Sequence, residues 1–494
     1  MDDIKEHELV YRVAKLIKEN KDLNAQVKEL LTQVEKLSKD HERLENILAV
    51  IPPDVLPKGV KSEIGMQTLR FKMVTVMYMD IQGFKKISED QKSEDIIDEL
   101  DKIFFHFNEI ADKYQIQRIK TIGDAYMCAG GVPVKNITNP IDVVLAALEM
   151  GEFLRQLKAE YEAQNRRFWD LRIGIHTGPV TATASGRKRI AYDLKGETVN
   201  ITTRMATASD VGIINLSVYT YELVKEYFIC EYSGKIPVKY EGDLEMYFVK
   251  RLKHAYSSDR KIGLFPNDIF QVKYALRQFT DLQEIILDKL EKELPSYLYY
   301  HNYKHTIDVV NQAELIGYGE GVDDEAILLL KTAALFHDAG HTIGYDNHEY
   351  YGTELVREWL PKWKYTQGQI DRICEIIMAT KLPPSPQALL ERIICDSDLD
   401  YLGRSDFIPV SNTLYEELKA QNKINDLNTW NKLQVKFLSK HQYFTKTANT
   451  LREVNKEKQI ERIKQLIIWE PGEEPPLVVT ENNQDSINGT NHSG

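Results

Sequence analysis

Apolar residues recur at alternating intervals of four and three over the first fifty residues, a spacing that predicts a coiled coil over residues 1–51. Leucine fills every d position and valine fills three a positions, a choice that favours two parallel strands. Asn20 at another a position favours pairing in one register. A helix packed on its own domain is the alternative, but the unbroken repeat favours a dimer. The repeat ends before Pro52 and consists of Leu9, Val13, Leu16, Asn20, Leu23, Val27, Leu30, Val34, Leu37, His41, Leu44 and Leu48.

Between residues 66 and 252, short apolar and β-branched runs alternate with amphipathic segments, a pattern that predicts an α/β domain. A strand over Met73–Met79 leaves Asp80 at its end, and Arg118–Gly131 is typical of a β-hairpin with a Gly-Asp tip. A helix that contains Asn200 and Arg204 presents both on one face, because they are four residues apart. A further strand is predicted at Arg172–Ile175, and the segment His176–Val180 follows it. A late hairpin is predicted to begin at Val238-Lys239 and to end at Met246–Val249.

Residues 263–470 show helical periodicity and few β-branched runs, which predicts an all-helical domain. The clearest helical segments are Phe270–Leu290, Glu325–Phe336, Tyr351–Leu360 and Ile370–Ala379. Residues 471–494 are rich in Pro, Glu, Asn and Gly and are predicted to be a disordered tail.

Composition limits the class of protein. A chain of 494 residues has room for two or three domains, and a net charge of −12 argues against a nucleic-acid-binding surface. The four cysteines are widely spaced, which indicates reduced thiols rather than a disulfide scaffold or a structural zinc site. No signal-peptide core and no uncharged apolar run of membrane-spanning length occur in the sequence. We therefore expect a soluble, cytoplasmic protein that handles small molecules.

The predicted hairpin tip is the first candidate for chemistry. Asp124 offers oxygen to a hard cation, and Lys120 offers a hydrogen bond to a base or a phosphate. By itself a Gly-Asp turn usually has no function beyond the turn, so a functional interpretation of this segment depends on the motifs around it.

Those motifs resemble a known family. The segments MYMDIQGF, RIKTIGDAYM, LRIGIHTGPV and YDLKGETVNITTRM are similar, in order and separation, to the signatures of class III nucleotidyl cyclases. The resemblance covers the whole α/β block. It implies a ferredoxin-like catalytic domain of βαββαβ type, which acts as a homodimer and shares its active sites across the interface.

The resemblance also implies a role for each matching residue. Asp80 and Asp124, with the carbonyl of Ile81, match the ligands of two metal ions per site, Mg²⁺ or Mn²⁺. Lys120 and Asp193 match the pair that reads adenine, so the nucleotide is expected to be ATP. The other matches are Asn200 and Arg204, which orient the ribose and stabilise the transition state, Lys239 on the phosphates, and Gly83 and Phe84 at the substrate.

Two positions depart from the family pattern. Thr183 replaces a usual glycine and Glu241 replaces a usual second lysine. The alternative, an inactive cyclase kept for dimerisation, normally lacks a metal-binding Asp, the Asn or the Arg. None of these residues is missing here, which favours an active enzyme.

Histidine concentrates in the helical block, together with an adjacent His-Asp pair and a distant Asp. One histidine on an apolar helix is usually a packed core residue, but six together indicate a metal site. The pattern is similar to the HD superfamily of metal-dependent phosphohydrolases. That resemblance implies His305, His337, Asp338 and Asp398 as ligands of Mn, Fe, Zn or Mg, with Asp396 as the alternative to Asp398 and with His341, His348 and Asp396 close to the ligands.

YHNYKH resembles the YHNxxH signature of class I cyclic-nucleotide phosphodiesterases, which implies His301 as the general acid. Because His301 lies four residues before His305, both are expected on one side of a helix. The sequence thus predicts a bifunctional enzyme that converts ATP to cAMP in one domain and hydrolyses a phosphodiester, with a cyclic nucleotide as the first candidate, in the other. In the alternatives, the HD domain hydrolyses a different nucleotide, or only binds one as a sensor. Nucleic acid and membrane are not expected as partners.

Overall fold

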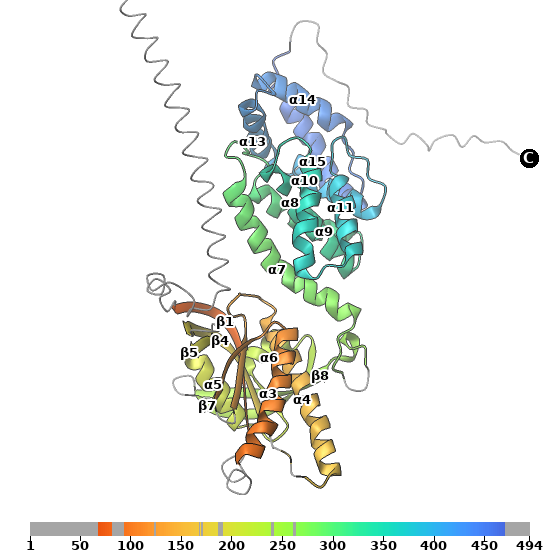
Figure 1. The fold of residues 1–494 in the computed structure, drawn as a ribbon. Helices are drawn as coiled ribbons and strands as arrows, with labels where there is room; N and C mark the ends of the chain where they lie inside the picture. The colour runs from red at the N-terminus through yellow and green to blue at the C-terminus, as the bar shows by residue number, and fades with distance from the viewer. Residues whose placement is uncertain are drawn as a thin grey trace, which may run out of the picture. The chain divides into compact units, whose positions relative to one another are not determined.

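The structure of the protein is a computed structural model, and the chain divides into two compact units (Figure 1). Unit 1 contains Asn139–Val224, Cys230–Val249 and the described residues up to Lys135, and unit 2 contains Asn136–Thr138, Lys225–Ile229 and those from Lys250 on. The predicted coiled coil and the predicted tail lie outside the described residues. The structure describes residues 68–81, 93–122, 125–166, 168, 171–185, 191–238, 242–259 and 263–469.

Unit 1 is an α/β domain built on one sheet. Its strands lie in the order β2-β3-β1-β4-β6-β8-β7, and β5 pairs with β4. The first elements follow the order β-α-β-β-α-β that the resemblance implied. The elements are β1 (Thr68–Ile81), α3 (Ser93–Lys113), β2 (Gln117–Ile122), β3 (Ala125–Gly130), α4 (Asn139–Ala163), β4 (Leu171–Ser185), β5 (Ala191–Lys195), α5 (Glu197–Thr207), β6 (Ile214–Ser217), α6 (Val218–Val224), β7 (Phe228–Val238) and β8 (Gly242–Leu252).

Side chains on β1 alternate between two packed faces, because successive residues of a strand point in opposite directions. Thr75 bonds to the Asn139 side chain at the start of α4, with both its N–H and its hydroxyl donating to Oδ1. Val74 and Val76 point to the other face, in a cluster that includes Val199 of α5. Asp80 is an even number of residues from Val76, so it belongs to the face that α5 covers.

The strand predicted at Arg172–Ile175 is longer than the sequence indicated. β4 continues through His176–Val180 to Ser185, because antiparallel pairing with β1 extends over most of both strands. Glycine makes room for α5 on this strand. A Cβ added at Gly174 would lie 2.3 Å from the Ala206 nitrogen, so the helix backbone packs directly on the strand. The late hairpin was predicted to begin at Val238-Lys239, but Val238 is the last residue of β7.

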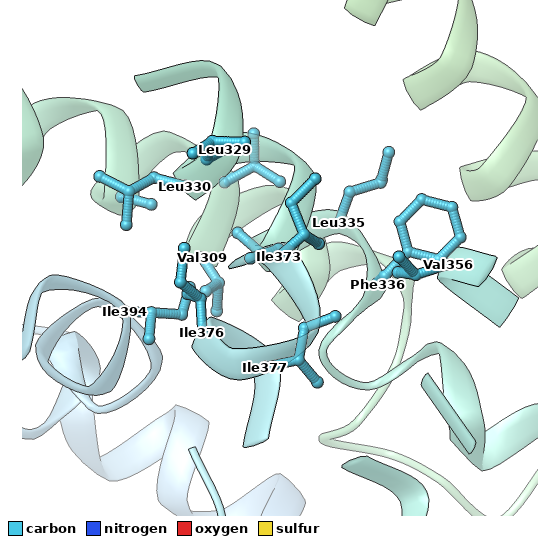
Figure 2. Packing of buried hydrophobic residues seen from close by; sticks show 14 of the residues in the cluster. Val309, Leu329, Leu330, Leu335, Phe336, Val356, Ile373, Ile376, Ile377 and Ile394 are labelled. Atoms are coloured by element: carbon cyan, nitrogen blue, oxygen red, sulfur yellow. The ribbon is translucent and has the colours of Figure 1, made fainter. Parts of the chain in front are cut away.

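Unit 2 is all helical, as predicted, and all four helical segments named from the sequence are confirmed. Its main core joins helices α7 to α12, and Figure 2 shows Val309, Leu330, Phe336, Ile376 and Ile394 packed in it. Its α-helices are α7 (Asp268–Glu293), α8 (Tyr303–Gly319), α9 (Asp324–Phe336), α10 (His348–Trp359), α11 (Gln367–Met378), α12 (Leu389–Asp398), α13 (Phe407–Ala420), α14 (Leu427–Lys440) and α15 (Lys446–Lys464), and its 3₁₀ turns are η2 (His254–Tyr256), η3 (Ala339–Thr342), η4 (Leu360–Trp363) and η5 (Asp400–Gly403).

Among the helices that the structure describes, none combines the length and the apolar character needed to cross a bilayer.

Candidate functional sites

The first candidate site begins at the end of β1, where Asp80 lies opposite Arg172 of β4. Arg172 donates to both carboxylate oxygens, from Nε to Oδ1 at 3.2 Å and from Nη2 to Oδ2 at 2.8 Å. Arg172 also donates from Nη1 to the Thr207 carbonyl at the end of α5. This bidentate pair fixes the Asp80 carboxylate, and sequence analysis assigned Arg172 no role. A carboxylate accepts about four hydrogen bonds, so two lone-pair directions remain for a divalent cation.

Helix α5 carries Asn200 and Arg204 on its exposed side. Thr198, Ile201 and Met205 are buried toward the sheet, which turns the Asn200–Arg204 stripe outward. Asp193 lies on the neighbouring strand β5, where its side chain is 41% exposed and lies 3.9 Å from Lys195. Thr183, one of the two departures from the family pattern, is the β4 residue paired with Asp193.

The structure places the other predicted cyclase residues only in part. Lys120 and Ile81 belong to β2 and β1, and their side chains are not among those described. β2 and β5 contact each other, so the two strands that carry Lys120 and Asp193 are neighbours. Gly83, Phe84, Asp124, Lys239 and Glu241 lie outside the described residues.

The second candidate site is a buried cluster of histidines and carboxylates in unit 2. His305 is on α8, His337 and Asp338 follow α9, and Asp398 is the last residue of α12. His305 Nε2 lies 3.1 Å from Asp398 Oδ1 and 3.5 Å from Asp338 Oδ2. His337 Nε2 lies 3.3 Å from Asp338 Oδ2 and 3.5 Å from Asp398 Oδ1. The four residues predicted as metal ligands are therefore together.

The bonding of this cluster fits a divalent metal. His337 Nδ1 lies 2.7 Å from the Ala334 carbonyl and donates to it, which directs the lone pair of Nε2 toward the carboxylates. His337 Nε2 and Asp338 Oδ2 are buried and have no hydrogen-bond partner. Burial raises the pKa of Asp338, but the surrounding histidines, His337 first, outweigh this effect, so the pKa falls well below its usual range. Two carboxylates and two imidazoles are a donor set that Mn, Fe, Zn and Mg accept.

Asp338 also belongs to a second group, in which His301, Asp338 and His341 each offer a ligand atom within 4.8 Å of the others. His341 stacks on His348 with ring centroids 4.0 Å apart, and His348 Nε2 lies 3.6 Å from Asp338 Oδ1. Burial lowers the pKa of His341 to about 3, so its ring is neutral and able to coordinate. The cluster thus offers two adjacent metal-capable groups, and Asp338 of the second group also lies within 3.5 Å of His305 and His337 of the first.

His301 does not lie on a helix with His305, which corrects the sequence expectation. Helix α8 begins at Tyr303 with Asn302 as its N-cap, because the Asn302 side chain accepts the Lys304 N–H. His301 occupies the turn before the cap. Its ring centroid nevertheless lies 5.0 Å from that of His341, so the turn places the His301 side chain beside the cluster.

Glu417 on α13 holds His301 and was not found from the sequence. Its Oε1 lies 2.6 Å from His301 Nδ1, and its Oε2 accepts the N–H groups of Tyr300 and His301. Burial lowers the pKa of His301, but the hydrogen bond to Glu417 and the nearby carboxylates raise it above its usual value. Glu417 is fully buried whereas Glu416 is exposed, and no sequence signal separates the two.

Asp396, the alternative ligand, is engaged elsewhere. Its oxygens accept the N–H groups of Phe444 and Thr445 and the Thr445 hydroxyl, at 2.7 to 2.9 Å. Thr445 is the N-cap of α15, so Asp396 secures the start of that helix. It is absent from both groups of metal-capable residues found in the described part of the chain.

Comparison with known proteins identifies the two domains. Residues 66–251 match the family model of the adenylate and guanylate cyclase catalytic domain, and residues 302–400 match that of the HD domain. The chain therefore combines a class III cyclase catalytic domain with an HD domain that follows it.

Relatives of the cyclase domain include both nucleotide classes. A membrane guanylyl cyclase of Dictyostelium discoideum is 35% identical over 216 residues, which are 44% of this chain and 14% of the relative. An adenylate cyclase of Mycobacterium tuberculosis is 29% identical over 231 residues, 47% of this chain and 49% of the relative. The chain spans about half or less of these two relatives. Among solved structures, the adenylyl cyclase CyaB from P. aeruginosa is 29% identical, with 40% of this chain and 99% of that chain covered at a TM-score of 0.35.

Proposed function

We propose that the protein is a bifunctional nucleotide enzyme whose HD domain hydrolyses a phosphodiester and whose cyclase domain converts ATP to 3′,5′-cAMP and pyrophosphate. The observation that carries the HD part is the buried cluster in which His305, His337, Asp338 and Asp398 converge. An aspartate held at a strand end beside an exposed Asn–Arg stripe supports the cyclase part.

In the cyclase reaction, the ribose 3′-hydroxyl attacks the α-phosphorus and pyrophosphate leaves. Divalent metals would lower the pKa of the hydroxyl and neutralise the phosphates. Asp80, together with Asp124, would hold them. Arg204 donates hydrogen bonds to oxygens on which negative charge develops, and Asn200 orients the ribose. Their exposure on α5 supports a homodimer, because a second copy then covers them and encloses the nucleotide.

Adenine is the proposed base. Its N6 amino group donates a hydrogen bond, which Asp193 accepts, and its N1 accepts one, which Lys120 donates. Guanine presents the reverse pattern at these positions, so the pair discriminates against GTP. The contact between β2 and β5 supports this assignment.

In the HD domain, His305, His337, Asp338 and Asp398 would hold a divalent metal, which activates a water for attack on phosphorus. His301 would protonate the leaving ester oxygen as that bond breaks. Glu417 supports this role, because its hydrogen bond raises the pKa of His301 and so favours the protonated ring. Asp396 would act on the metal only indirectly, by fixing the start of α15.

Two alternatives for the HD domain are hydrolysis of a different nucleotide and binding without hydrolysis. A sensor has no need of a histidine that a buried carboxylate holds beside the metal ligands, so the His301–Glu417 pair favours an enzyme.

The test is to incubate the purified full-length chain, loaded with Mn²⁺, Fe²⁺, Zn²⁺ or Mg²⁺ in turn, with cAMP, cGMP, a cyclic dinucleotide and a nucleoside tetraphosphate. We expect 5′-AMP from cAMP with at least one metal. Hydrolysis of the dinucleotide or tetraphosphate alone would favour the first alternative. Binding with no product under any metal would favour the second.

A further inference from the structure

Helix α14 carries a basic face in a chain whose net charge is −12. Its lysines, Lys432, Lys436 and Lys440, are spaced by four residues and therefore form one stripe along the helix, which contains no Asp or Glu. Lys436 and Lys440 are exposed, and neither has an ion pair with a described residue. A stripe of like charges that no described carboxylate neutralises favours a negatively charged occupant.

A second stripe, beside the lysines, is apolar. Leu433 and Phe437 each follow a lysine by one residue, and they are 50% and 39% exposed. The opposite side of α14 is buried and includes Trp430, Val435 and Leu438. The exposed face is thus both basic and apolar, so a suitable occupant combines carboxylates with aliphatic side chains.

The end of the described part of the chain lies against this helix. Asn428, in the first turn of α14, donates from Nδ2 to the Ile468 carbonyl at 3.0 Å and accepts the Ile468 N–H at 2.8 Å. The centroid of the Trp469 ring lies 5.8 Å from Lys432 Nζ. The segment that follows Trp469 is therefore attached beside the lysine stripe.

That segment has the composition that the face of α14 requires. Residues 470–485 contain no Lys or Arg and five acidic residues, which are Glu470, Glu473, Glu474, Glu481 and Asp485. The aliphatic run Leu477–Val479 lies between these carboxylates in the sequence. A segment so rich in Pro and Glu cannot bury a core of its own, but it can bind to a surface that supplies charge and apolar contact.

The dimensions of the two partners agree. From Lys432 to Lys440 the helix rises about 12 Å. Four or five extended residues after Trp469 span about 13–18 Å, so Glu473 and Glu474 can reach the far end of the stripe. Attachment at one end keeps the effective concentration of the segment at about the millimolar level, so even weak exposed ion pairs contribute to binding.

We propose that residues 470–485 bind to the exposed face of α14 in the same chain, with their carboxylates on the lysine stripe and their aliphatic run on Leu433 and Phe437. The occupant is thus a segment of this chain rather than a membrane or a second copy. The contact goes beyond the proposed activities and does not depend on them, because neither candidate site is part of it.

The test measures how fast elastase cleaves the run Leu477–Val479 in the full-length protein at low ionic strength. A bound segment is cleaved only when it opens, so the rate follows the unbound fraction. We expect Lys436→Glu with Lys440→Glu to raise the rate about 5- to 10-fold, as for the loss of two exposed ion pairs. The control, Lys364→Glu with Lys381→Glu, makes the same change of charge at other exposed positions of unit 2 and should be cleaved at the wild-type rate.

Two further measurements tie the effect to these charges. In about 0.5 M salt the difference between the wild type and the stripe variant should disappear, because salt screens exposed ion pairs. Adding Glu473→Lys and Glu474→Lys to the stripe variant exchanges the charges and should restore slow cleavage. The milder pair Lys436→Gln with Lys440→Gln should change the rate in the same direction, which guards against an effect of misfolding.

Equal cleavage rates in the wild type and the stripe variant would overturn the contact, and so would a faster rate that the exchanged charges do not restore. Carbodiimide cross-links between the stripe and the segment, formed in ¹⁵N-labelled and unlabelled chains after subunit exchange, identify the occupant. Links within one isotope class support the contact, whereas mixed links would place the segment on a second copy and overturn it. If the cleavage rates are equal and only the wild type binds phosphatidylserine vesicles, the face belongs to a membrane instead.

Discussion

The two candidate sites differ in how far one chain completes them. In the HD domain the side chains of His305, His337 and Asp338 are 9%, 1% and 8% exposed, and helices from one unit enclose them. In the cyclase domain the candidate residues Asn200 and Arg204 are exposed and Asp193 is partly exposed, and among the described candidate side chains only Asp80 is tightly held. A buried cluster provides its own low-dielectric surroundings, whereas an open one needs another surface to exclude water. The HD site should therefore work within one chain, and the cyclase site should need a second copy.

The largest expected effect is at Asp338, which lies between the two metal-capable groups of the HD domain. Asp338→Asn preserves the shape but removes a charge that lies close to histidines of both groups. We expect loss of metal and a fall in phosphodiester hydrolysis of about 10³-fold, since metal supplies several kcal/mol of transition-state stabilisation. Metal analysis and separate assays of both activities check this. Cyclase activity should stay unchanged, and Asp371→Asn, at an exposed position of α11, serves as the control. A cyclase that falls in parallel would contradict the independence of the sites.

A smaller effect is expected at the buried glutamate behind His301. Glu417→Gln keeps the packing but removes the charge that raises the pKa of His301. We expect the hydrolysis rate to fall about 10- to 100-fold while the metal content stays constant, as for other partners that orient a site residue. The matched control is Glu416→Gln, one residue away and exposed. Equal rates for the two variants would remove Glu417 from the site.

The candidate ligands of the HD domain could be chosen from the sequence because their chemistry is concentrated in short motifs. The doublet His337-Asp338 and the helix that ends at Asp398 are local features, and helical periodicity indicated the packing around them. Glu417 was not found from the sequence because its role comes from burial against a loop 116 residues away, which no local pattern encodes. Arg172 was not assigned a role for the same reason, since its partner Asp80 is on another strand, 92 residues away. His301 was misplaced because the spacing of four matched a helix, whereas Asn302 caps the helix after it.

In the cyclase domain, the choice of nucleotide tests whether the more open site still distinguishes adenine from guanine. We expect the wild type to prefer ATP over GTP, and Lys120→Glu with Asp193→Cys to reduce that preference about 10- to 100-fold, as for two lost charge-assisted hydrogen bonds. The preference is measured as the ratio of the steady-state rates on ATP and GTP. Lys102→Gln, exposed on α3, makes the same net change of one charge and serves as the control. Similar wild-type rates on ATP and GTP would contradict the assignment of the pair.

The smallest effect concerns the stability of the sheet in unit 1. Burial lowers the pKa of His176 to about 4, and its Nδ1 lies 2.7 Å from the Ser217 hydroxyl. The unfolded chain, with a pKa near 6.5, binds the proton first as the pH falls, so stability present above pH 6.5 is lost toward pH 4. Between pH 7.5 and 5.5 this lowers the free energy of unfolding by about 1 kcal/mol.

Urea titrations at both pH values should therefore show a smaller pH dependence for His176→Gln than for the wild type. The exposed His254→Gln variant should behave as the wild type does. An identical pH dependence in all three proteins would show that His176 is not the group responsible.

Complementation between inactive variants tests the contrast between the sites most directly. Asp80→Asn and Arg204→Ala are co-expressed for the cyclase, and His305→Ala and Asp338→Asn for the HD domain. Half of the dimers then contain one copy of each variant, and a cyclase site shared between copies is intact once in each, so about a quarter of the wild-type cyclase rate should return. Phosphodiester hydrolysis should not return at all. No recovery of cyclase activity in mixed dimers, or recovery of hydrolysis, would contradict the account.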